Sequence, residues 1–344
     1  MNNLFVLHTQ YNLIIASGLC LCDFKGDQND LILFHDFKMA DNHKMCIDKT
    51  FRKSMILEGN FPHKDESYLE KNKRIRTQNA RIFEFISASR YDRIFIIEDM
   101  CIQEMFAMKC VLEQNSHVSM AWLEDGSNAY FVNSTISEGM GKTPFRRFIR
   151  KLFFCTQYGL WKTYYLGEFM GSNPLLKEVY VTFPQSIRRE FADRTILEIS
   201  QDAFQHGMEV LFRAEPIYFE ENSIMIVMDK LAVYGDQLEK VNDFVTQIAA
   251  QAHKDGRCVY YKYHPRETDS LPALQGAIEL ERTMAFESYL TNASTKAITV
   301  VGFKSTALQT AKKLGYQTVS YIRQVEPDNL NGIVFYDKIG IICK

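Results

Sequence analysis

The sequence predicts an α/β protein built from two doubly wound, Rossmann-like domains that face a central cleft. Two observations support this prediction. Short apolar runs with strand character alternate with helical patterns, and the alternation restarts after a break beyond the middle of the chain. In addition, 344 residues, 46% of them hydrophobic and 24% charged, are enough to form two sizeable cores.

The first alternating series occupies the N-terminal part of the chain. Strands followed by helices indicate parallel βαβ units. The polar stretch 37–66 is expected to form a loop. The predicted strands are 4–9, 30–36, 92–99 and one within 117–126, and the predicted helices are 11–22, 67–89 and 102–114.

The second series begins after "RAEPIYFEEN", which interrupts the periodicity within the boundary region 200–222. Gly256 and Gly315 are expected to end two of its helices. We therefore predict one Rossmann-like domain over 1–205 and a second over 206–344. The predicted strands are 223–230, 257–265, 296–303 and 316–322, and the predicted helices are 236–256 and 305–315.

Charge and cysteine content restrict the class of protein. A net charge of −2 argues against nucleic-acid binding through bulk positive charge. No apolar stretch reaches the length that a bilayer-spanning helix needs, and the N-terminus lacks the pattern of a signal peptide. The eight cysteines are irregularly spaced, which indicates reduced thiols in a cytoplasmic protein.

Two adjacent acids end the strand within 117–126. Glu124 and Asp125 are followed at once by Gly126 and Ser127. A carboxylate at a rigid strand end can accept a proton from a substrate hydroxyl, especially where partial burial raises its pKa. The alternative is an acid that caps the following turn, with glycine at a positive φ.

Three further loops lie at predicted strand ends in the second half. Pro265 stops a strand directly after His264, so that His264 projects from a defined point and could contact a phosphate or a leaving group. Gly302 is expected to form a tight turn before Lys304, and Ser305 and Thr306 can cap a helix whose free N–H groups bind an anion.

Glu287 is an acid at the position where nucleotide-binding domains commonly hold ribose hydroxyls. Each of these motifs also has an ordinary structural interpretation. His264 could be a half-buried turn histidine, Ser305 an ordinary helix cap and Glu287 an exposed helix acid.

In chain order, these motifs resemble those of the bacterial sialyltransferases of GT-B architecture, which include lipooligosaccharide sialyltransferases and polysialyltransferases. Their D/E-D/E-G, His-Pro and late Ser-Ser/Thr signatures stand here as Glu124-Asp125-Gly126, His264-Pro265 and Ser305-Thr306. The opening "FVLHTQYNLIIAS" also resembles the first strand, loop and helix of the lipooligosaccharide enzymes, with Thr9-Gln10-Tyr11 in place of a Thr-Pro-Tyr-like loop.

The resemblance implies inverting transfer of sialic acid from CMP-sialic acid to a terminal sugar hydroxyl of a bacterial surface glycan. One of Glu124 and Asp125 would be the general base, a role the sequence leaves open between them. Residues 1–205 would form the acceptor-binding domain, with Thr9, Gln10, Gly126 and Ser127 on the acceptor side, and residues 206–344 would form the donor-binding domain. On the donor side, His264, Pro265, Gly302, Ser305 and Thr306 would contact the phosphate of CMP, and Glu287 would hold cytidine or its ribose.

We expect no metal and no cofactor besides the donor. The chain has no D-x-D motif, and no two of its histidines have i, i+4 spacing. "GMGKTP" at 139–144 lacks the first glycine of a P-loop. The partners expected are CMP-sialic acid and a glycan acceptor, with the enzyme a monomer or homodimer.

The basic, aromatic segment 145–165 has two interpretations. It could lie on an anionic membrane surface, which would place a cytoplasmic enzyme at the periphery of the inner membrane. It could instead be a helix with a solvated basic face and a buried aromatic face.

Other functions stay open at this stage. The most favoured linkage is α2,3 to galactose, with α2,6 and α2,8 as alternatives, and the acceptor could belong to lipooligosaccharide, O-antigen or capsule. A CDP-glycerol-dependent glycerophosphotransferase has similar motifs, but it usually carries an acid soon after its Ser pair, and here the next acid is Glu326. Another nucleotide-sugar transferase or a non-catalytic nucleotide-sugar-binding relative would also fit.

Overall fold

The structure is a computed structural model that describes residues 1–344 except 38, 60–65, 131–143, 168, 265–266 and 272–275. The chain divides into two compact units, Met1–Gly207 and Met208–Lys344. This division lies inside helix α7 (Gln201–Phe212), as does the boundary that the sequence suggested after residue 205. Each unit is an α/β structure around one parallel sheet.

Unit 1 contains a seven-stranded sheet in the order β3-β2-β1-β4-β5-β6-β7, with every neighbouring pair parallel. The central strands are continuous apolar runs that are buried on both faces, as parallel strands covered by helices require. The strands are β1 (Asn2–Leu7), β2 (Gln28–His35), β3 (Lys53–Glu58), β4 (Arg93–Ile96), β5 (Ser119–Leu123), β6 (Glu178–Val181) and β7 (Thr195–Glu198).

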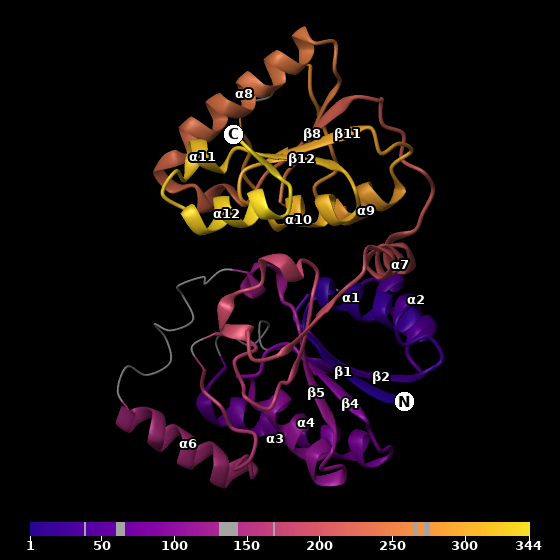
Figure 1. The fold of residues 1–344 in the computed structure, drawn as a ribbon, viewed down its shortest axis with the longest axis vertical. Coiled ribbons are helices and arrows are strands. Elements are labelled where there is room, and N and C mark those ends of the chain that lie inside the picture. The colour runs from indigo at the N-terminus through magenta and orange to yellow at the C-terminus, as the bar shows by residue number, and fades with distance from the viewer. Residues whose placement is uncertain (38, 60–65, 131–143, 168, 265–266, 272–275) are drawn as a thin grey trace. The chain divides into compact units, whose positions relative to one another are not determined.

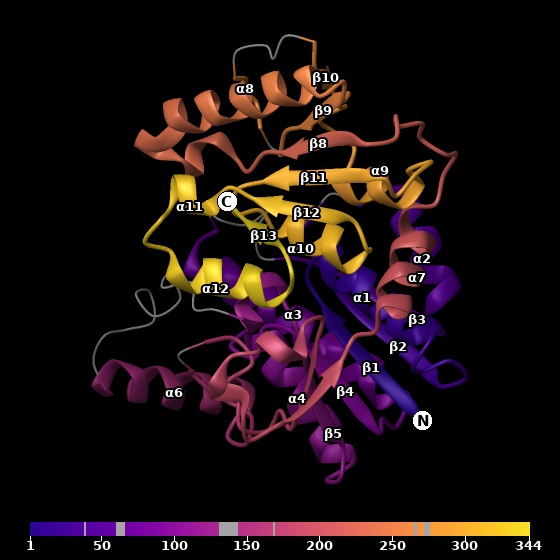
Figure 2. The same cartoon turned by 45° about the horizontal axis from the view of Figure 1, so that its top comes forward.

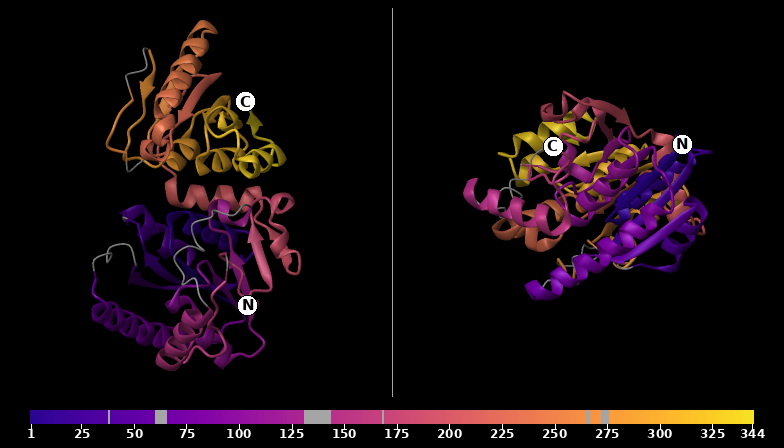
Figure 3. Two further views of the ribbon diagram at one scale, coloured as in Figure 1. Left: turned by 90° about the vertical axis from the view of Figure 1, so that its left-hand side faces the viewer. Right: turned by 90° about the horizontal axis from the view of Figure 1, so that it is seen from below.

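Helices cover both faces of this sheet. Helices α1 and α2 lie on one face, and α3 and α4 lie together on the other (Figure 1). Their bounds are α1 (Gln10–Leu21), α2 (Asp41–Thr50), α3 (Tyr68–Ser87) and α4 (Ile102–Gln114), and helix α6 (Pro144–Tyr158) follows later in the chain. The chain begins at β1, so the N-terminus marks the amino edge of the sheet (Figure 3).

The expectation of a loop over 37–66 is wrong for the part that the structure describes. That stretch holds α2 and β3. Helix α2 buries only His43, Cys46 and Ile47, and β3 is an edge strand with alternating burial, so neither shows a strong apolar run. The strands β6 and β7 and the helix α7 were also not predicted, because short strands and a mixed composition give weak periodicity.

Unit 2 contains a six-stranded sheet in the order β10-β9-β8-β11-β12-β13, again with every neighbouring pair parallel. Its strands are β8 (Ser223–Val227), β9 (Val259–Lys262), β10 (Ile278–Glu279), β11 (Ile298–Gly302), β12 (Gln317–Ser320) and β13 (Ile342–Cys343). Its helices are α8 (Leu238–Lys254), α9 (Phe286–Asn292), α10 (Thr306–Lys313), α11 (Ile322–Val325) and α12 (Leu330–Lys338). Helix α8 covers one face, and α10 and α12 cover the other (Figure 2).

Both sheets reverse their strand order once. In unit 1 the reversal lies between β1 and β4, and in unit 2 it lies between β8 and β11. Because all strands are parallel, the loops at such a reversal separate above the carboxyl edge, which is where open α/β sheets bind ligands. The segments that follow β1, β4, β8 and β11 are therefore the first places to look for a site.

Candidate active site

Glu124 follows β5 directly and is fully buried. Each of its two carboxylate oxygens accepts two hydrogen bonds. The Tyr11 hydroxyl donates to Oε1 at 2.6 Å and the Thr182 backbone N–H donates to Oε2 at 2.9 Å. The hydroxyls of Thr182 and Tyr130 also donate, to Oε1 and Oε2 respectively. Burial raises the pKa of Glu124, and these hydrogen bonds oppose that rise.

Local sequence explains why these donors meet at Glu124. Tyr11 lies in the first turn of α1, directly after the carboxyl end of β1, and Thr182 follows the carboxyl end of β6. Gly126, with φ 54°, turns the chain after Asp125 and starts a short 3-10 helix that ends before Tyr130. Glu124 thus joins three strand ends and has no oxygen left for a substrate.

Asp125 is in a different environment, because it is partly exposed. The amide of Asn12 lies 3.4 Å from its Oδ1. Burial raises the pKa of Asp125, while the Asn12 hydrogen bond and the charge of His8 oppose the rise. Of the two acids that the sequence left open, Asp125 is the one that substrate could reach, with the partly exposed Gly126 and Ser127 next to it.

Thr9 and Gln10, which the sequence placed on the acceptor side, have local structural roles. The Thr9 side chain caps α1 by accepting the Asn12 N–H at 3.2 Å, and Gln10 Oε1 lies 3.0 Å from His43 Nε2. The next two residues, Tyr11 and Asn12, are the ones that contact the acids. Their position just beyond a predicted strand end was the signal that could have identified them.

Sequence reasoning missed a buried charge cluster around His8, which follows β1. The His8 side chain is 1% exposed, with Nδ1 3.2 Å from Asp36 Oδ2 and Nε2 2.8 Å from Glu104 Oε1. Burial lowers the pKa of His8, but the carboxylates of Asp36 and Glu104, with the charge of Glu98, raise it well above its ordinary value. The ring therefore lies between two carboxylates, which favour its protonated form.

His8, Glu98 and Cys101 also place one potential metal-ligand atom each within 4.8 Å of one another. Both ring nitrogens of His8 face carboxylates, Asp36 through Nδ1 and Glu104 through Nε2. Burial raises the pKa of the Cys101 thiol to about 11. The contacts of His8 therefore form a buried ion-pair cluster.

In unit 2, His264 lies just beyond the carboxyl end of β9 and is partly buried. Its carbonyl accepts the Glu267 N–H at 2.9 Å. The Glu267 carboxylate in turn accepts the N–H groups of Leu231 at 2.6 Å and of Thr268 and Asp269 at 3.0 Å each. Glu267 thus ties the loop after His264 to the segment after β8, while Pro265 lies outside the described residues.

The loop after β11 brings the predicted anion-binding residues together. Ser305 caps α10 by accepting the Ala307 N–H at 3.3 Å, and Thr306 is exposed at the first position of that helix. The tight turn expected at Gly302 is wrong, because Gly302 is the last residue of β11. A Cβ at this position would come within 3.0 Å of the Val227 carbonyl oxygen, so glycine permits close strand packing instead.

Asp229, just beyond β8, is a site residue that the sequence analysis did not select. Its Oδ2 accepts the Tyr234 hydroxyl at 2.8 Å and lies 3.4 Å from the Lys304 N–H. Burial raises the pKa of Asp229, and these contacts oppose the rise. Strand order β9-β8-β11 therefore brings His264, Asp229 and Ser305 to the same carboxyl edge.

Glu287 is partly buried in the first turn of α9 rather than a fully exposed helix acid. Burial raises its pKa, and the charge of Lys262 opposes that rise. Lys262 is itself 1% exposed, and its ammonium donates to the carbonyls of Tyr263 at 2.8 Å and Arg282 at 3.0 Å. Burial lowers the pKa of Lys262 to about 8.

Two parallel α/β units with polar strand ends define the fold class of GT-B glycosyltransferases and related epimerases. The structure is similar to UDP-GlcNAc 2-epimerase from Methanocaldococcus jannaschii, with a TM-score of 0.57 and 11% identity over 99% of this chain and 92% of that chain. It is also similar to UDP-GlcNAc 2-epimerase from Neisseria meningitidis, with a TM-score of 0.54 and 11% identity over 99% and 95%.

A third similar structure is the alpha/beta-galactoside alpha-2,3-sialyltransferase of the luminous marine bacterium Photobacterium phosphoreum. Its TM-score is 0.53, with 11% identity over 99% of this chain and 96% of that chain. No curated sequence relative matches the chain. The model of the alpha-2,8-polysialyltransferase (POLYST) family matches residues 21–322, and the chain belongs to this family. It is therefore a glycosyltransferase of the sialyltransferase class.

Proposed function

We propose that this enzyme transfers sialic acid from CMP-sialic acid to the terminal sialic acid of a bacterial surface glycan, forming an α2,8 linkage with inversion. The family that matches most of the chain is described by that linkage. This is the reason to prefer α2,8 over the α2,3 linkage to galactose that the motifs favoured.

Asp125 is the general base in this proposal. Its carboxylate removes the proton from the acceptor hydroxyl, whose oxygen forms the new bond to the anomeric carbon of sialic acid. The bond from that carbon to CMP breaks, and the electron pair leaves with the phosphate oxygen. The observation that carries the proposal is the difference between the two acids: Glu124 is fully buried with both oxygens occupied, and Asp125 is partly exposed at the same strand end.

The donor binds at the carboxyl edge of unit 2. His264 donates a hydrogen bond to the phosphate of CMP, and Ser305 and Thr306 meet it at the start of α10. Glu287 holds the ribose hydroxyls. Because CMP is an anionic leaving group, hydrogen-bond donors and a helix start can stabilise it, and we propose that no metal takes part.

The test measures CMP release and product formation from CMP-sialic acid in excess EDTA, with oligosialic acid or lactose as acceptor. We expect the Asp125→Asn variant to lose roughly 10²- to 10⁴-fold in kcat, the usual contribution of a general base, with CMP binding unchanged by calorimetry. Glu124→Gln, at the neighbouring position, should lose stability more than it loses the chemical step in the fraction that stays folded.

Several outcomes would contradict the proposal. Full activity of Asp125→Asn would remove its role as base, and activity that only Mg²⁺ restores would overturn metal independence. Transfer to lactose alone would favour the α2,3 linkage. Reaction with CDP-glycerol instead would support the glycerophosphotransferase alternative, and CMP-sialic acid binding without turnover would support a non-catalytic relative.

We also propose that the reaction takes place in the cytoplasm. All eight cysteines are free thiols, which suits a reducing compartment. Fractionation of the native host, with the protein detected by antibody, tests this location. Among the described residues, no helix is both long and apolar enough to cross a membrane.

A further inference from the structure

Helix α6 exposes an apolar stripe that the described residues of unit 1 leave uncovered. Phe145, Phe148, Ile149, Leu152 and Phe153 are 72%, 61%, 47%, 45% and 41% exposed. Their spacing of three and four residues places them along one face of the helix. Figures 1 and 2 both draw α6 at the margin of unit 1. Exposed apolar surfaces of this kind mark interaction sites in soluble proteins.

Among the described residues, the apolar contacts that hold α6 to the core lie near its C-terminal end. Cys155 and Tyr158 are buried in a cluster with Ile75 of α3 and Met105 of α4. The Tyr158 hydroxyl donates to Asn72 Oδ1 at 2.7 Å. The earlier interpretation of a helix with a buried aromatic face therefore applies to its last turn alone. The first turns of α6 expose their aromatic side chains, while its C-terminal end is packed against α3 and α4.

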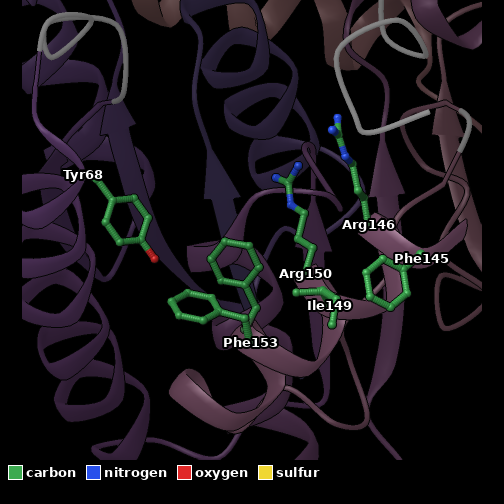
Figure 4. A pocket seen from close by; sticks show the side chains of 7 residues that line it. Tyr68, Phe145, Arg146, Ile149, Arg150 and Phe153 are labelled. Carbon is green, nitrogen blue, oxygen red and sulfur yellow. The ribbon is translucent and has the colours of Figure 1, made fainter. Parts of the chain in front are cut away.

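The apolar surface continues onto the start of α3. Tyr68 is 60% exposed, and its ring centroid lies 6.4 Å from that of Phe153. Together with Phe145 and Ile149, these side chains line an open groove (Figure 4). Residues from two separate helices thus contribute to one apolar surface.

Positive charge covers the other face of α6. Arg146 and Arg150 lie next to the stripe, Arg147 and Lys151 lie farther around the helix, and α6 contains no acidic residue. The guanidinium groups of Arg146 and Arg150 extend in a common direction from the helix (Figure 4). A helix with an apolar face and a basic face has the pattern of helices that lie in the interface of an anionic membrane.

We propose that α6, with Tyr68, binds the surface of a membrane rich in anionic phospholipid. The phenylalanine, leucine and isoleucine side chains enter the acyl boundary, and the four cations meet the headgroups. A soluble polyanionic glycan would pair with the cations but would leave the apolar stripe in water. A lipid surface explains both the cations and the exposed apolar side chains of α6. The inference goes beyond the proposed function and does not depend on it.

The experiment is flotation of the purified full-length protein, without any substrate, with two kinds of vesicle. One kind is phosphatidylcholine alone, and the other is phosphatidylcholine mixed with phosphatidylglycerol. We expect binding to the mixed vesicles, weakened by added salt. The double variant Arg146→Gln/Arg147→Gln should bind these vesicles more weakly, by on the order of fivefold per charge removed. Phe148→Ser/Leu152→Ser should reduce binding by at least about tenfold.

Matched controls come from exposed positions on unit 2. Lys240→Gln/Lys254→Gln removes two exposed charges from α8, and Leu330→Ser removes an exposed leucine from α12. Both should bind like the parent, and unchanged thermal unfolding would show that each variant is folded. Equal binding to neutral and mixed vesicles overturns recognition of anionic lipid. Absence of flotation, or self-association that Phe148→Ser/Leu152→Ser abolishes, overturns the membrane proposal itself.

Discussion

At the scale of single residues, two neighbouring carboxylates have different surroundings, and we propose different roles for them on that ground. Glu124 is enclosed by Tyr11, Tyr130 and Thr182, whereas the Asp125 side chain, among the described residues, meets the amide of Asn12 at 3.4 Å. The Glu124 oxygens already accept four hydrogen bonds, so this side chain holds the neighbouring strand ends together. A partly exposed carboxylate beside it is free to take a proton.

This assignment predicts the acid limb of the pH–rate profile. Burial raises the pKa of Asp125 above its ordinary value, and a general base works only when ionised. We therefore expect kcat/KM to fall as pH falls through a pKa above 3.8. The Asn12→Ala variant loses a hydrogen bond to the carboxylate, so the limb should move to higher pH. A limb unchanged in that variant would assign it to another group.

The ion pairs of His8 lead to a second prediction, which concerns how the free energy of unfolding depends on pH. Its folded pKa lies well above 6.5 because Asp36 and Glu104 outweigh the cost of burial. A raised pKa contributes stability that is fully present below the unfolded pKa and is lost as pH rises through the folded one. Below pH 6.5, we expect His8→Gln to reduce the free energy of unfolding by about 3–5 kcal/mol, because the fully buried Glu104 carboxylate loses the charge of His8 and Asp36 loses one of its contacts.

The measurement is urea unfolding of the parent and His8→Gln across a pH series. The parent should lose the His8 contribution as pH rises, and the variant should lack that part of the decline. His117→Gln, at an exposed histidine of the same unit, serves as the control and should follow the parent. Equal stability of parent and His8→Gln at low pH would show that the His8 ion pairs contribute nothing.

At the scale of elements, α1 and α7 approach each other through two glycines. A Cβ on Gly18 would lie 1.8 Å from the carbonyl oxygen of Ala203, and a Cβ on Gly207 would lie 2.0 Å from that of Ile14. These contacts involve backbone atoms, which cannot rotate away as a side chain can. The close crossing of the two helices therefore requires glycine at both positions.

Gly18→Ala and Gly207→Ala should each lower the free energy of unfolding by about 1–3 kcal/mol, the usual cost of overpacking, despite the higher helix propensity of alanine. Gly332→Ala in α12 is the matched control, because the nearest atoms there belong to the side chains of Asn329 and Ile322. The Asn329 oxygen that must move also caps α12 by accepting the Gly332 N–H at 3.0 Å, so we expect a loss smaller than at Gly18 or Gly207 in the same denaturant titration. If all three variants behave alike, the crossing is looser than the structure indicates.

Elements with strong periodicity could be predicted from the sequence, and weak ones could not. Helix α4 spans 102–114, as predicted, because apolar residues recur throughout the segment and Asn115 follows its last residue. Helix α2 and strand β3 were missed, because an edge position leaves few apolar residues to reveal them. Burial of an edge element depends on neighbours that are distant in the chain, and a local pattern does not contain them.

At the scale of the whole molecule, the proposed α2,8 linkage has a consequence for the product. Each transfer leaves a new terminal sialic acid, which is again an acceptor, so repeated reaction should extend one glycan many times. We expect anion-exchange chromatography of the products from an oligosialic acid primer to show a ladder that lengthens with time. A single addition that then stops would contradict α2,8 elongation and would favour the α2,3 alternative.

The sequence by itself determined the fold class, because apolar periodicity is local in the chain. It also determined the order of the strand-end motifs, whose resemblance to those of bacterial sialyltransferases indicated the class of enzyme. Only the tertiary structure decided which acid is enclosed, that Tyr11 and Thr182 hold it, and that His8 lies between Asp36 and Glu104. Those contacts join residues 28 to 113 positions apart. The folded sheet brings such strand ends together, and burial then sets which carboxylate is enclosed and which one solvent can reach.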